Sequence, residues 1–317
     1  MKIQMLVLMC SYILGMLANM IILPYLKKVK VGQVVRDDGP KSHLKKAGTP
    51  TMGGIAILMS SLVMLAIAAF YYPIIGLAVI PFVGFGLIGM VDDIKKLKKS
   101  NTDGLSPIKK IIFLFIVSSI FILLYLTVFE LGTDILIPFF KQHILLSTGL
   151  FVIFTIFILI GTSNAINLTD GLDGLATGII IIIMGFFTVI AIKNNNQEMA
   201  VFGSTIIGTC SAFLLFNIQP AKMFLGDTGS LALGGAIASM AIILKMPVYL
   251  GIVALIPVFE TISVALQVIY FKSTKGKRLF KMAPFHHHLE LSGMKETMIV
   301  IVFWVITAAL CILAYFI

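Results

Sequence analysis

Five short polar clusters hold the side chains of this chain that could do chemistry. They contain carboxylates, amides, lysines and histidines within a chain that is otherwise strongly apolar. Carboxylates can bind a divalent cation and lysines can neutralise phosphates, and phosphoryl transfer is catalysed mainly by such positioning and charge neutralisation. The clusters are Lys46–Gly54, Met90–Lys96, Asn164–Gly174, Asn217–Ser230 and Pro284–Glu290.

The adjacent carboxylates of Asp92 and Asp93 stand where an apolar run meets a basic segment. Two neighbouring carboxylates at a membrane edge repel each other and lose hydration, so a positive partner must stabilise them. A magnesium ion is the economical partner, because Mg²⁺ binds one or two carboxylates together with substrate phosphates. The alternative is a solvated helix end at which Lys95 and Lys96 are the partners.

Four polar side chains of the third cluster recur at three-residue steps, namely Asn164, Asn167, Asp170 and Asp173. In a helical or 3₁₀ turn they would share one face. Amides and carboxylates on one face, with glycines beside them, suit a closely fitting polar ligand.

Two further clusters combine polar residues with the expected start of a helix. Lys46–Gly54 would expose backbone N–H groups at the positive end of a helix, which suits an anion. Asp227 lies between Gly226 and the segment 228–230 that begins another helix, which would place a metal-binding carboxylate near backbone donors. Ordinary helix capping is the alternative for both clusters.

Three consecutive histidines, His286, His287 and His288, stand in the last basic segment. If the segment is helical, successive side chains point ~100° apart, so the three cannot easily bind one metal ion. We expect one or two of them to donate to phosphate or sugar oxygens and another to pack. The segment 84–89 matches a dinucleotide-binding pattern, but it lies inside an apolar run and is better explained by helix packing.

The elements that must position these clusters are membrane-spanning helices. Of the 317 residues, 59% are hydrophobic and only 12% are charged, and the mean hydropathy is +1.07. Soluble domains carry about 25% charged residues, so this composition excludes a soluble globular protein and a disordered chain. Cys10, Cys210 and Cys311 lie far apart in apolar runs, which indicates small core side chains rather than a disulfide or metal framework.

Apolar runs of about 20 residues, the length that crosses a bilayer, recur along the chain. The run 247–270 is the least regular, because Pro247 and Pro257 interrupt it and it contains Glu260. We expect an all-α polytopic fold with residues 1–317 as a single integral membrane domain. Residues 130–145 would form a short hairpin or lie along the membrane surface. The ten predicted spans are 3–26, 51–70, 74–91, 110–129, 145–163, 175–192, 199–218, 229–245, 247–270 and 297–317.

The distribution of basic residues predicts how the chain is oriented. All but four of the 24 lysines and arginines follow odd-numbered spans, the exceptions being Lys2, Lys141, Lys193 and Lys245. Lys and Arg gather in cytoplasmic loops, so we predict both termini outside and the polar clusters at the cytoplasmic face. Anionic lipid would attract these lysines, but it would repel the ten of the 14 acids that we place on the same face.

In their order and spacing the clusters resemble the phospho-N-acetylmuramoyl-pentapeptide transferases. The likeness runs from about residue 30 to the last span and rests on Gly39–Gly54, Val91–Asp93, Asn167–Gly174, Phe224–Ser230 and Pro284–Glu290. The wider polyprenyl-phosphate N-acetylhexosamine-1-phosphate transferase superfamily shares the Asp-Asp and Asn-x-x-Asp-Gly-x-Asp-Gly elements. The Thr-Pro-Thr-Met-Gly-Gly entry and the triple histidine favour the muramoyl-pentapeptide branch.

The resemblance implies a ten-helix enzyme of the bacterial plasma membrane, commonly homodimeric, with its active site facing the cytoplasm. It implies transfer of phospho-MurNAc-pentapeptide from UDP-MurNAc-pentapeptide to undecaprenyl phosphate, which gives lipid I and UMP in the first membrane step of peptidoglycan synthesis. The implied cofactor is Mg²⁺, and the partners are these two substrates and membrane lipid, with no nucleic acid.

The same resemblance, together with the third cluster, supplies the predicted site residues. The catalytic residues are Asp92, Asp93, Asp227 and His286, and the metal ligands are Asp227 and Asp92. The predicted substrate-binding residues are Lys46, Thr51, Lys96, Lys110, Asn164, Asn167, Asp170, Asp173, Asn217, Phe224, His287 and His288.

Two questions of mechanism and class stay open at this point. An Asp could deprotonate the lipid phosphate or act as a covalent nucleophile; a phosphate monoester has its second pKa near ~6 and is already mostly a dianion, so we favour direct attack with Asp92 in a positioning role. A transporter or lipid flippase is the alternative class. It would place polar groups near the bilayer midplane, whereas the acids here gather at one face.

Overall fold

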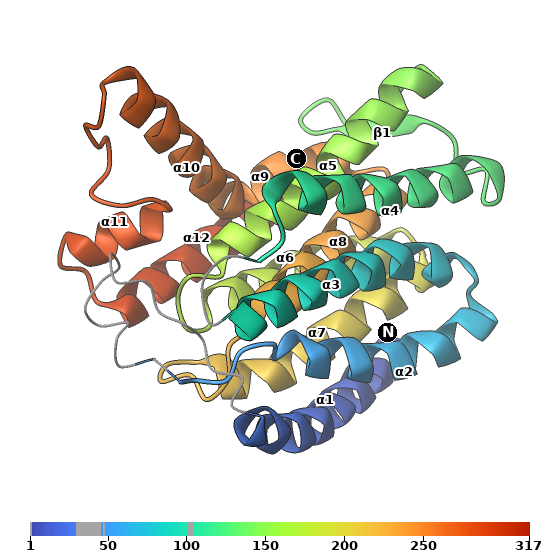
Figure 1. Cartoon of the computed structure of the whole chain (residues 1–317). Helices are drawn as coiled ribbons and strands as arrows, with labels where there is room; N and C mark the ends of the chain where they lie inside the picture. Colours follow the sequence, from blue (N-terminus) through green and yellow to red (C-terminus); the bar gives the residue numbers. More distant parts are fainter. Residues whose placement is uncertain (1, 30–45, 47, 100–103) are drawn as a thin grey trace.

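The chain folds as a bundle of long apolar helices in a computed structural model that describes residues 2–29, 46, 48–99 and 104–317. In these residues, ten helices are long and apolar enough to cross a membrane, which confirms the all-α polytopic fold. They are α1 (Lys2–Lys28), α2 (Gly54–Tyr71), α3 (Ile74–Lys99), α4 (Pro107–Thr127), α5 (Thr148–Thr169), α6 (Leu175–Lys193), α7 (Gln197–Asn217), α8 (Gly226–Ile243), α10 (Leu255–Ser273) and α12 (Glu296–Phe316) (Figure 1).

The predicted span 247–270 is wrong in its first part. Pro247–Tyr249 form the 3₁₀ helix η2, Leu250–Val253 form the single turn α9, and α10 begins at Leu255. A proline has no backbone N–H and fits the first turn of a helix, so Pro247 starts a new turn, and Pro257 lies in the first turn of α10.

Three helices reach further into the polar clusters than the sequence predicts. Helix α3 continues past residue 91 to Lys99, so the Asp92–Asp93 pair lies within the helix and not at its end. Helix α5 continues past residue 163 to Thr169 and carries Asn164 and Asn167. Helix α8 begins at Gly226, so Asp227 belongs to its first turn. The apolar-run criterion ended α3 and α5 too early and began α8 too late, because polar residues that face a protein interior continue a helix as well as apolar ones do.

A short hairpin follows α4. Strand β1 (Asp134–Ile137) pairs antiparallel with β2 (Gln142–Leu145), and Asp134 stands opposite Leu145. The hairpin is fixed to the turn after α8, because the Leu136 N–H donates to the carbonyl oxygen of Lys245 at 2.7 Å. Of the two expectations for residues 130–145, the hairpin is therefore the one observed.

Helix α8 lies at the centre of the bundle. All its residues from Thr228 to Ile243 are buried, and it packs against α2, α3 and α5. Glycines bring the neighbouring helices into backbone contact: a Cβ atom on Gly54 of α2 would lie 2.2 Å from the Cα of Gly229, and one on Gly89 of α3 would lie 2.1 Å from the carbonyl oxygen of Asp227. Helices α2 and α3 thus pack against the backbone of the first turn of α8, with only a glycine at each contact.

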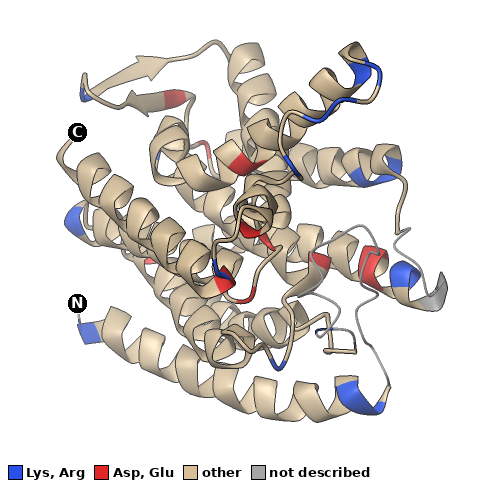
Figure 2. Cartoon of the chain, turned by 90° about the vertical axis from the view of Figure 1, so that its left-hand side faces the viewer, with Lys and Arg blue, Asp and Glu red and all other residues tan. Residues whose placement is uncertain are grey.

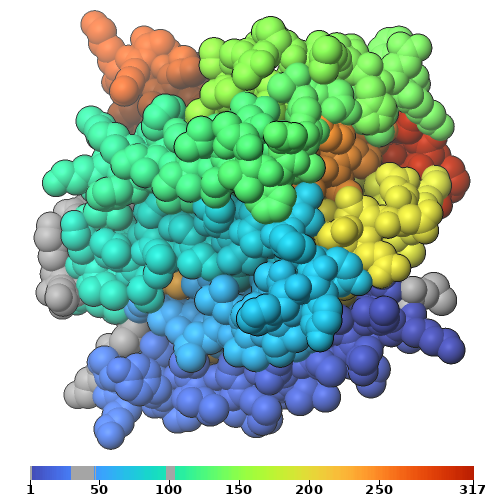
Figure 3. Space-filling view, turned by 90° about the vertical axis from the view of Figure 1, so that its right-hand side faces the viewer, coloured from blue at the N-terminus to red at the C-terminus, as the bar shows by residue number. Residues whose placement is uncertain are grey.

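The two ends of the bundle differ in charge. In Figure 2 both termini and the hairpin lie on the left, whereas the basic ends of α1, α3 and α10 lie on the right. Figure 3 shows α1 along the lower edge beside α2, with α3 and α4 above them. The polar clusters described next gather toward the basic end, where the short helix α11 (Phe285–Leu291) also lies (Figures 1 and 2).

Candidate active site

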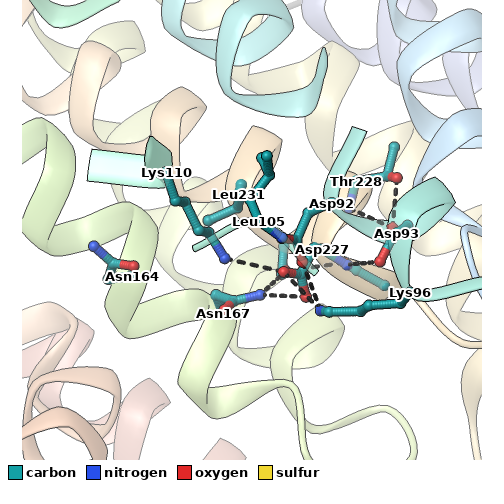
Figure 4. Close-up of polar contacts among 12 residues, drawn as sticks. Asp92, Asp93, Lys96, Leu105, Lys110, Asn164, Asn167, Asp227, Thr228 and Leu231 are labelled. Atoms are coloured by element: carbon teal, nitrogen blue, oxygen red, sulfur yellow. Dashed lines mark hydrogen bonds and ion pairs between the residues drawn. The ribbon is translucent and has the colours of Figure 1, made fainter. Parts of the chain in front are cut away.

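The centre of the candidate site is the carboxylate of Asp227 in the first turn of α8 (Figure 4). Its Oδ2 atom lies 3.0 Å from Lys110 Nζ and 3.1 Å from Lys96 Nζ. Its Oδ1 atom accepts a hydrogen bond of 3.0 Å from the side-chain amide of Asn167. Helices α3, α4, α5 and α8 therefore each bring at least one charged or polar group to the same point.

Asp92 lies beside Asp227, and both carboxylates contact the same lysine. The Oδ2 atom of Asp92 is 2.7 Å from Lys96 Nζ, and its Oδ1 atom accepts a hydrogen bond of 2.6 Å from the backbone N–H of Leu105. Like charges at this spacing repel each other, so the two lysines must neutralise the pair while no cation is bound. Lys96, one of the two lysines named as partners in the alternative interpretation of this pair, thus contacts Asp92 and is shared with Asp227.

Asp93 points the other way and caps α8. Its Oδ2 atom accepts hydrogen bonds of 2.9 Å from the Thr228 N–H and 2.6 Å from the Thr228 hydroxyl, and its Oδ1 atom accepts one of 3.2 Å from the Asp227 N–H. A carboxylate at a helix N-terminus satisfies free N–H groups and opposes the positive end of the dipole. Asp93 therefore fixes the turn that carries Asp227.

The start of α2 and the segment before α8 are joined by backbone hydrogen bonds. The Phe224 N–H donates to the Pro50 carbonyl, and the Gly53 N–H donates to the Phe224 carbonyl, both at 2.8 Å. Gly226 has a φ of +73°, and a Cβ atom there would lie 3.0 Å from Thr51 Oγ1. The predicted residues Thr51 and Phe224 thus lie next to the Asp227 turn.

Asp170 ends the polar face of α5, just beyond the spanning helix. Burial raises the pKa of Asp170 to about 8, and the negative charges of Asp227 and Asp93 act in the same direction. The backbone N–H of Gly226 opposes this shift only in part. A carboxyl group with this pKa is mostly protonated at neutral pH, so Asp170 can donate a hydrogen bond there.

A second charged cluster joins Lys46, Asp173 and Glu296. Lys46 Nζ lies 2.7 Å from Asp173 Oδ1 and 2.6 Å from Glu296 Oε1. Glu296 Oε1 also accepts a hydrogen bond of 2.8 Å from the Asp173 N–H. The predicted residues Lys46 and Asp173 are therefore brought together, in contact with each other rather than with Asp227.

The histidines fall into three environments on α11. His286 is fully buried, with its Nδ1 atom 3.3 Å from Glu260 Oε2, and it packs so closely on Gly171 that a Cβ atom there would lie 2.1 Å from its Nε2 atom. The Nδ1 atom of His287 lies 2.9 Å from Glu290 Oε2. His288 accepts the Lys281 N–H and packs on Phe285. His288 thus packs on an aromatic side chain, and donation by the other histidines to phosphate or sugar oxygens stays a prediction.

Two predicted binding residues, Asn217 and Asn164, make their hydrogen bonds within the helix bundle, and their role in binding stays a prediction. Asn217 is buried, accepts a hydrogen bond of 2.8 Å from Thr177 and donates one of 3.1 Å to the Met223 carbonyl. Asn164 donates to the Ile160 carbonyl one turn earlier in its own helix and lies apart from the Asp227 group (Figure 4). Three-residue spacing alone did not distinguish Asn164 from Asn167, which contacts Asp227. Such spacing shows that residues share a helix face, but it does not show how far along that face a site extends.

Sequence reasoning missed the roles of three residues that hold the site: Thr228, Glu260 and Glu296. The Thr228 hydroxyl donates to Asp93, Glu260 contacts buried His286, and Glu296 contacts Lys46. An acid inside an apolar run was the available signal for Glu260, since such a residue needs a partner in the protein. The segment 30–45 and Ala47 of the predicted first cluster lie outside the described residues.

The donor set around Asp227 fits a magnesium ion. Two carboxylates, those of Asp227 and Asp92, lie against each other with the Asn167 amide beside them. Mg²⁺ prefers oxygen ligands and takes one or two carboxylates with substrate phosphates. Among the described residues, no group of three or more His, Cys, Asp or Glu side chains is arranged to hold a metal. A cation bound by these two carboxylates would take its other ligands from substrate or water and would replace a lysine contact.

Comparison with known proteins agrees with this architecture. The family model for glycosyl transferase family 4 matches residues 75–245, which include the acidic pair of α3 and the whole of α8. The fold and the charged site thus define a membrane-embedded transferase. The signature of phospho-N-acetylmuramoyl-pentapeptide transferases matches residues 46–58, the segment that enters α2.

Relatives of similar length narrow the class further. A phospho-N-acetylmuramoyl-pentapeptide transferase of Acetivibrio thermocellus is 47% identical over 308 residues, which cover 96% of this chain and 92% of the relative. Those of Caldicellulosiruptor bescii and Clostridium perfringens are 44% and 45% identical, over 96% of this chain and 94% and 95% of their own lengths. The chain belongs to the phospho-N-acetylmuramoyl-pentapeptide transferase family.

Proposed function

We propose that this chain transfers phospho-MurNAc-pentapeptide from UDP-MurNAc-pentapeptide to undecaprenyl phosphate, and so forms lipid I and UMP in the first membrane step of peptidoglycan synthesis. The observation that carries the proposal is the meeting of Asp227, Asp92, Lys96 and Lys110 at one point at the end of a spanning bundle. Such a site suits a diphosphate from water and a phosphate carried by a lipid. Family membership supplies the identity of both substrates.

We assign the cofactor as Mg²⁺, with Asp227 and Asp92 as its ligands. Bound there, the ion would offset the negative charge of the diphosphate. Lys96 and Lys110 neutralise the negative charge of Asp227. When a cation replaces them there, both lysines are placed to bind phosphate oxygens. Asp93 and Asn167 keep the Asp227 turn in place, through the α8 N-terminus and the Asp227 side chain respectively.

The lipid phosphate needs little help to attack. Its second pKa is near ~6, so it is already mostly a dianion at neutral pH, and a general base adds little. We propose direct attack on the diphosphate, with Asp92 held by the Leu105 N–H in a positioning role. A trapped phospho-aspartyl enzyme, or UMP released without lipid acceptor, would show a covalent two-step reaction instead.

The test is release of UMP by the purified chain. Release should require UDP-MurNAc-pentapeptide, undecaprenyl phosphate and Mg²⁺ together, and omission of any one should abolish it. UDP-GlcNAc offered in place of the muramoyl donor separates this activity from that of a sister transferase. Turnover with UDP-GlcNAc but not with the muramoyl donor would contradict the proposal.

We also propose the membrane location and the orientation of the enzyme. We place the chain in the bacterial plasma membrane as a single integral domain, with both termini outside and the site facing the cytoplasm. The excess of lysines at one end of the bundle supports this orientation. The homodimer is proposed on the family resemblance alone.

A further inference from the structure

Glu296 joins three segments of the chain that carry predicted substrate-binding residues. It is the first residue of α12 and is only 9% exposed. Its Oε1 atom accepts from Lys46 Nζ at 2.6 Å and from the Asp173 N–H at 2.8 Å. Its Oε2 atom accepts from the Gln219 side-chain amide at 3.1 Å. One carboxylate thus contacts the entry to α2, the turn after α5 and the turn after α7.

We propose that Glu296 is a positioning residue of the transfer site, which holds Lys46 so that the lysine can meet the phosphates of the nucleotide-sugar donor. The inference rests on the function proposed above. It adds a residue that contacts no reacting atom and acts through Lys46.

The geometry at Lys46 leaves the lysine one direction to donate. An ammonium group has three N–H donors. Among the described residues, two of them go to Asp173 Oδ1 and Glu296 Oε1. The Lys46 side chain is 19% exposed, so the third donor can reach water or a ligand. Two fixed partners therefore determine where the third N–H points.

The carboxylate of Glu296 has several partners besides Lys46. A carboxylate in the first turn of a helix is stabilised by the positive end of the helix dipole. The Asp173 N–H and the Gln219 amide add two donors. Asp173 also accepts the Ala221 N–H at 3.0 Å on its second oxygen. The lysine thus lies between two carboxylates that are each anchored by other contacts.

The contacts of Glu296 are separate from those that pack α12 into the bundle. Helix α12 packs on α6, where the Trp304 indole donates to the Leu175 carbonyl at 3.2 Å, and buries Ile299 and Phe303. These groups lie further along the helix than its first residue. A change at Glu296 should therefore disturb the Lys46 cluster more than the fold.

The first test is Glu296→Gln, which keeps the side-chain length and removes the charge. We expect the KM for UDP-MurNAc-pentapeptide to rise about tenfold or more, the range typical for partners that orient a binding group. The KM for undecaprenyl phosphate and the thermal midpoint should stay close to the wild type. The matched control is Glu198→Gln, because Glu198 also lies in the first turn of a spanning helix, α7, and this variant should behave as wild type.

A double-mutant cycle with Lys46→Met separates positioning from a general structural effect. If Glu296 acts through Lys46, adding Glu296→Gln to Lys46→Met should change the donor KM by less than about twofold. Independent, additive losses would overturn the proposal. So would a lower donor KM in Glu296→Gln, which would mean that Glu296 only competes with phosphate for the lysine.

A second variant covers the case in which Glu296→Gln does not fold. Gln219→Leu removes one neutral donor at an exposed position, and we expect the donor KM to rise about threefold, the size typical of one hydrogen bond. An unchanged donor KM in that variant would overturn the proposal. Wild-type protein without UMP release would refute the proposed function instead, so the two failures are distinguishable.

Discussion

Asp227 holds two lysines on one oxygen atom and an amide on the other. Asp227→Asn keeps the shape of the side chain but removes the charge that Lys96 and Lys110 share. We expect UMP release to fall about 100-fold or more, as when a group that stabilises charge in a transition state is lost. Steady-state kinetics, with size-exclusion chromatography as the check on folding, measure this.

The control for that variant is the same exchange at the far end of the molecule. Asp134→Asn changes a carboxylate of the hairpin to an amide, and its turnover should equal that of the wild type. Retained activity in Asp227→Asn would remove Asp227 from the metal site.

At the scale of single residues, the sequence predicted which polar side chains gather near one another better than it predicted the contacts between them. Asp92, Lys96, Lys110, Asn167 and Asp227 do meet. Lys46 instead contacts Asp173, 127 positions away, and Glu296, 250 positions away. Residue type and local spacing show that a lysine can bind an anion, but they contain no information on which of several distant carboxylates reaches it in the fold.

Among the helices, the contact between α3 and α8 is the one on which the site depends most directly. Gly89 of α3 lies against the backbone of Asp227, so Gly89→Ala would force the two helices apart where α8 carries its carboxylate. Overpacking of this kind costs about 1–3 kcal/mol. We expect a lower thermal midpoint together with a large loss of UMP release.

Gly76→Ala is the matched control for Gly89→Ala. Gly76 belongs to the same helix, and a Cβ atom there would have no neighbour within 4 Å. This variant should keep the activity of the wild type and its stability. Equal behaviour of the two variants would mean that the close crossing does not determine the position of Asp227.

The hairpin is held by a charge cluster that depends on pH. Partial burial acts to raise the pKa of Asp134, but hydrogen bonds from Lys245 and His143 outweigh it and hold the pKa below its usual range. The stabilisation is therefore complete above the unfolded pKa near ~3.9 and is lost as the pH falls through the lower folded value. Because the Asp134 side chain is 34% exposed, the ionised carboxylate contributes less than about 1 kcal/mol to the free energy of unfolding.

The measurement compares the thermal midpoints of wild type and Asp134→Asn as a function of pH. The wild type should be the more stable of the two at pH values around ~6, and the difference should shrink toward pH ~3 as the Asp134 carboxylate is protonated. A difference that stays constant over this range would contradict the role of the ionised carboxylate.

The apolar runs of the sequence predicted how many long helices the described part of the chain forms, but they did not predict where each helix begins and ends. Ten apolar runs became ten spanning helices, because bilayer thickness fixes the length of such a helix. The errors lie where a helix continues through polar residues, as in α3, or where a proline divides an apolar run, as at Pro247. In both cases tertiary surroundings decide whether backbone groups stay satisfied, and an apolar-run criterion does not include them.

The whole molecule has one basic end, and its orientation can be tested directly. We expect Phe140→Cys in the hairpin turn to react with a membrane-impermeant maleimide in intact cells, and Lys275→Cys after α10 to react only after permeabilisation. Both positions are exposed. The background should carry alanine at Cys10, Cys210 and Cys311, the three native cysteines. The opposite labelling pattern would reverse the orientation.

The burial of α8 has a consequence for how the enzyme responds to its surroundings. A bilayer that becomes thicker, thinner or stiffer acts on the helices that it touches, and α8 is enclosed by other helices along its whole buried length. Helix α10 is much more exposed to the bilayer, because only 22% of its most apolar stretch is buried inside the protein, against 89% for α8. We therefore expect changes in lipid composition to alter the capture of the lipid acceptor before they alter the geometry around Asp227. The buried length of α8 begins at Thr228, directly after Asp227, so the helix that carries this carboxylate has little contact with lipid.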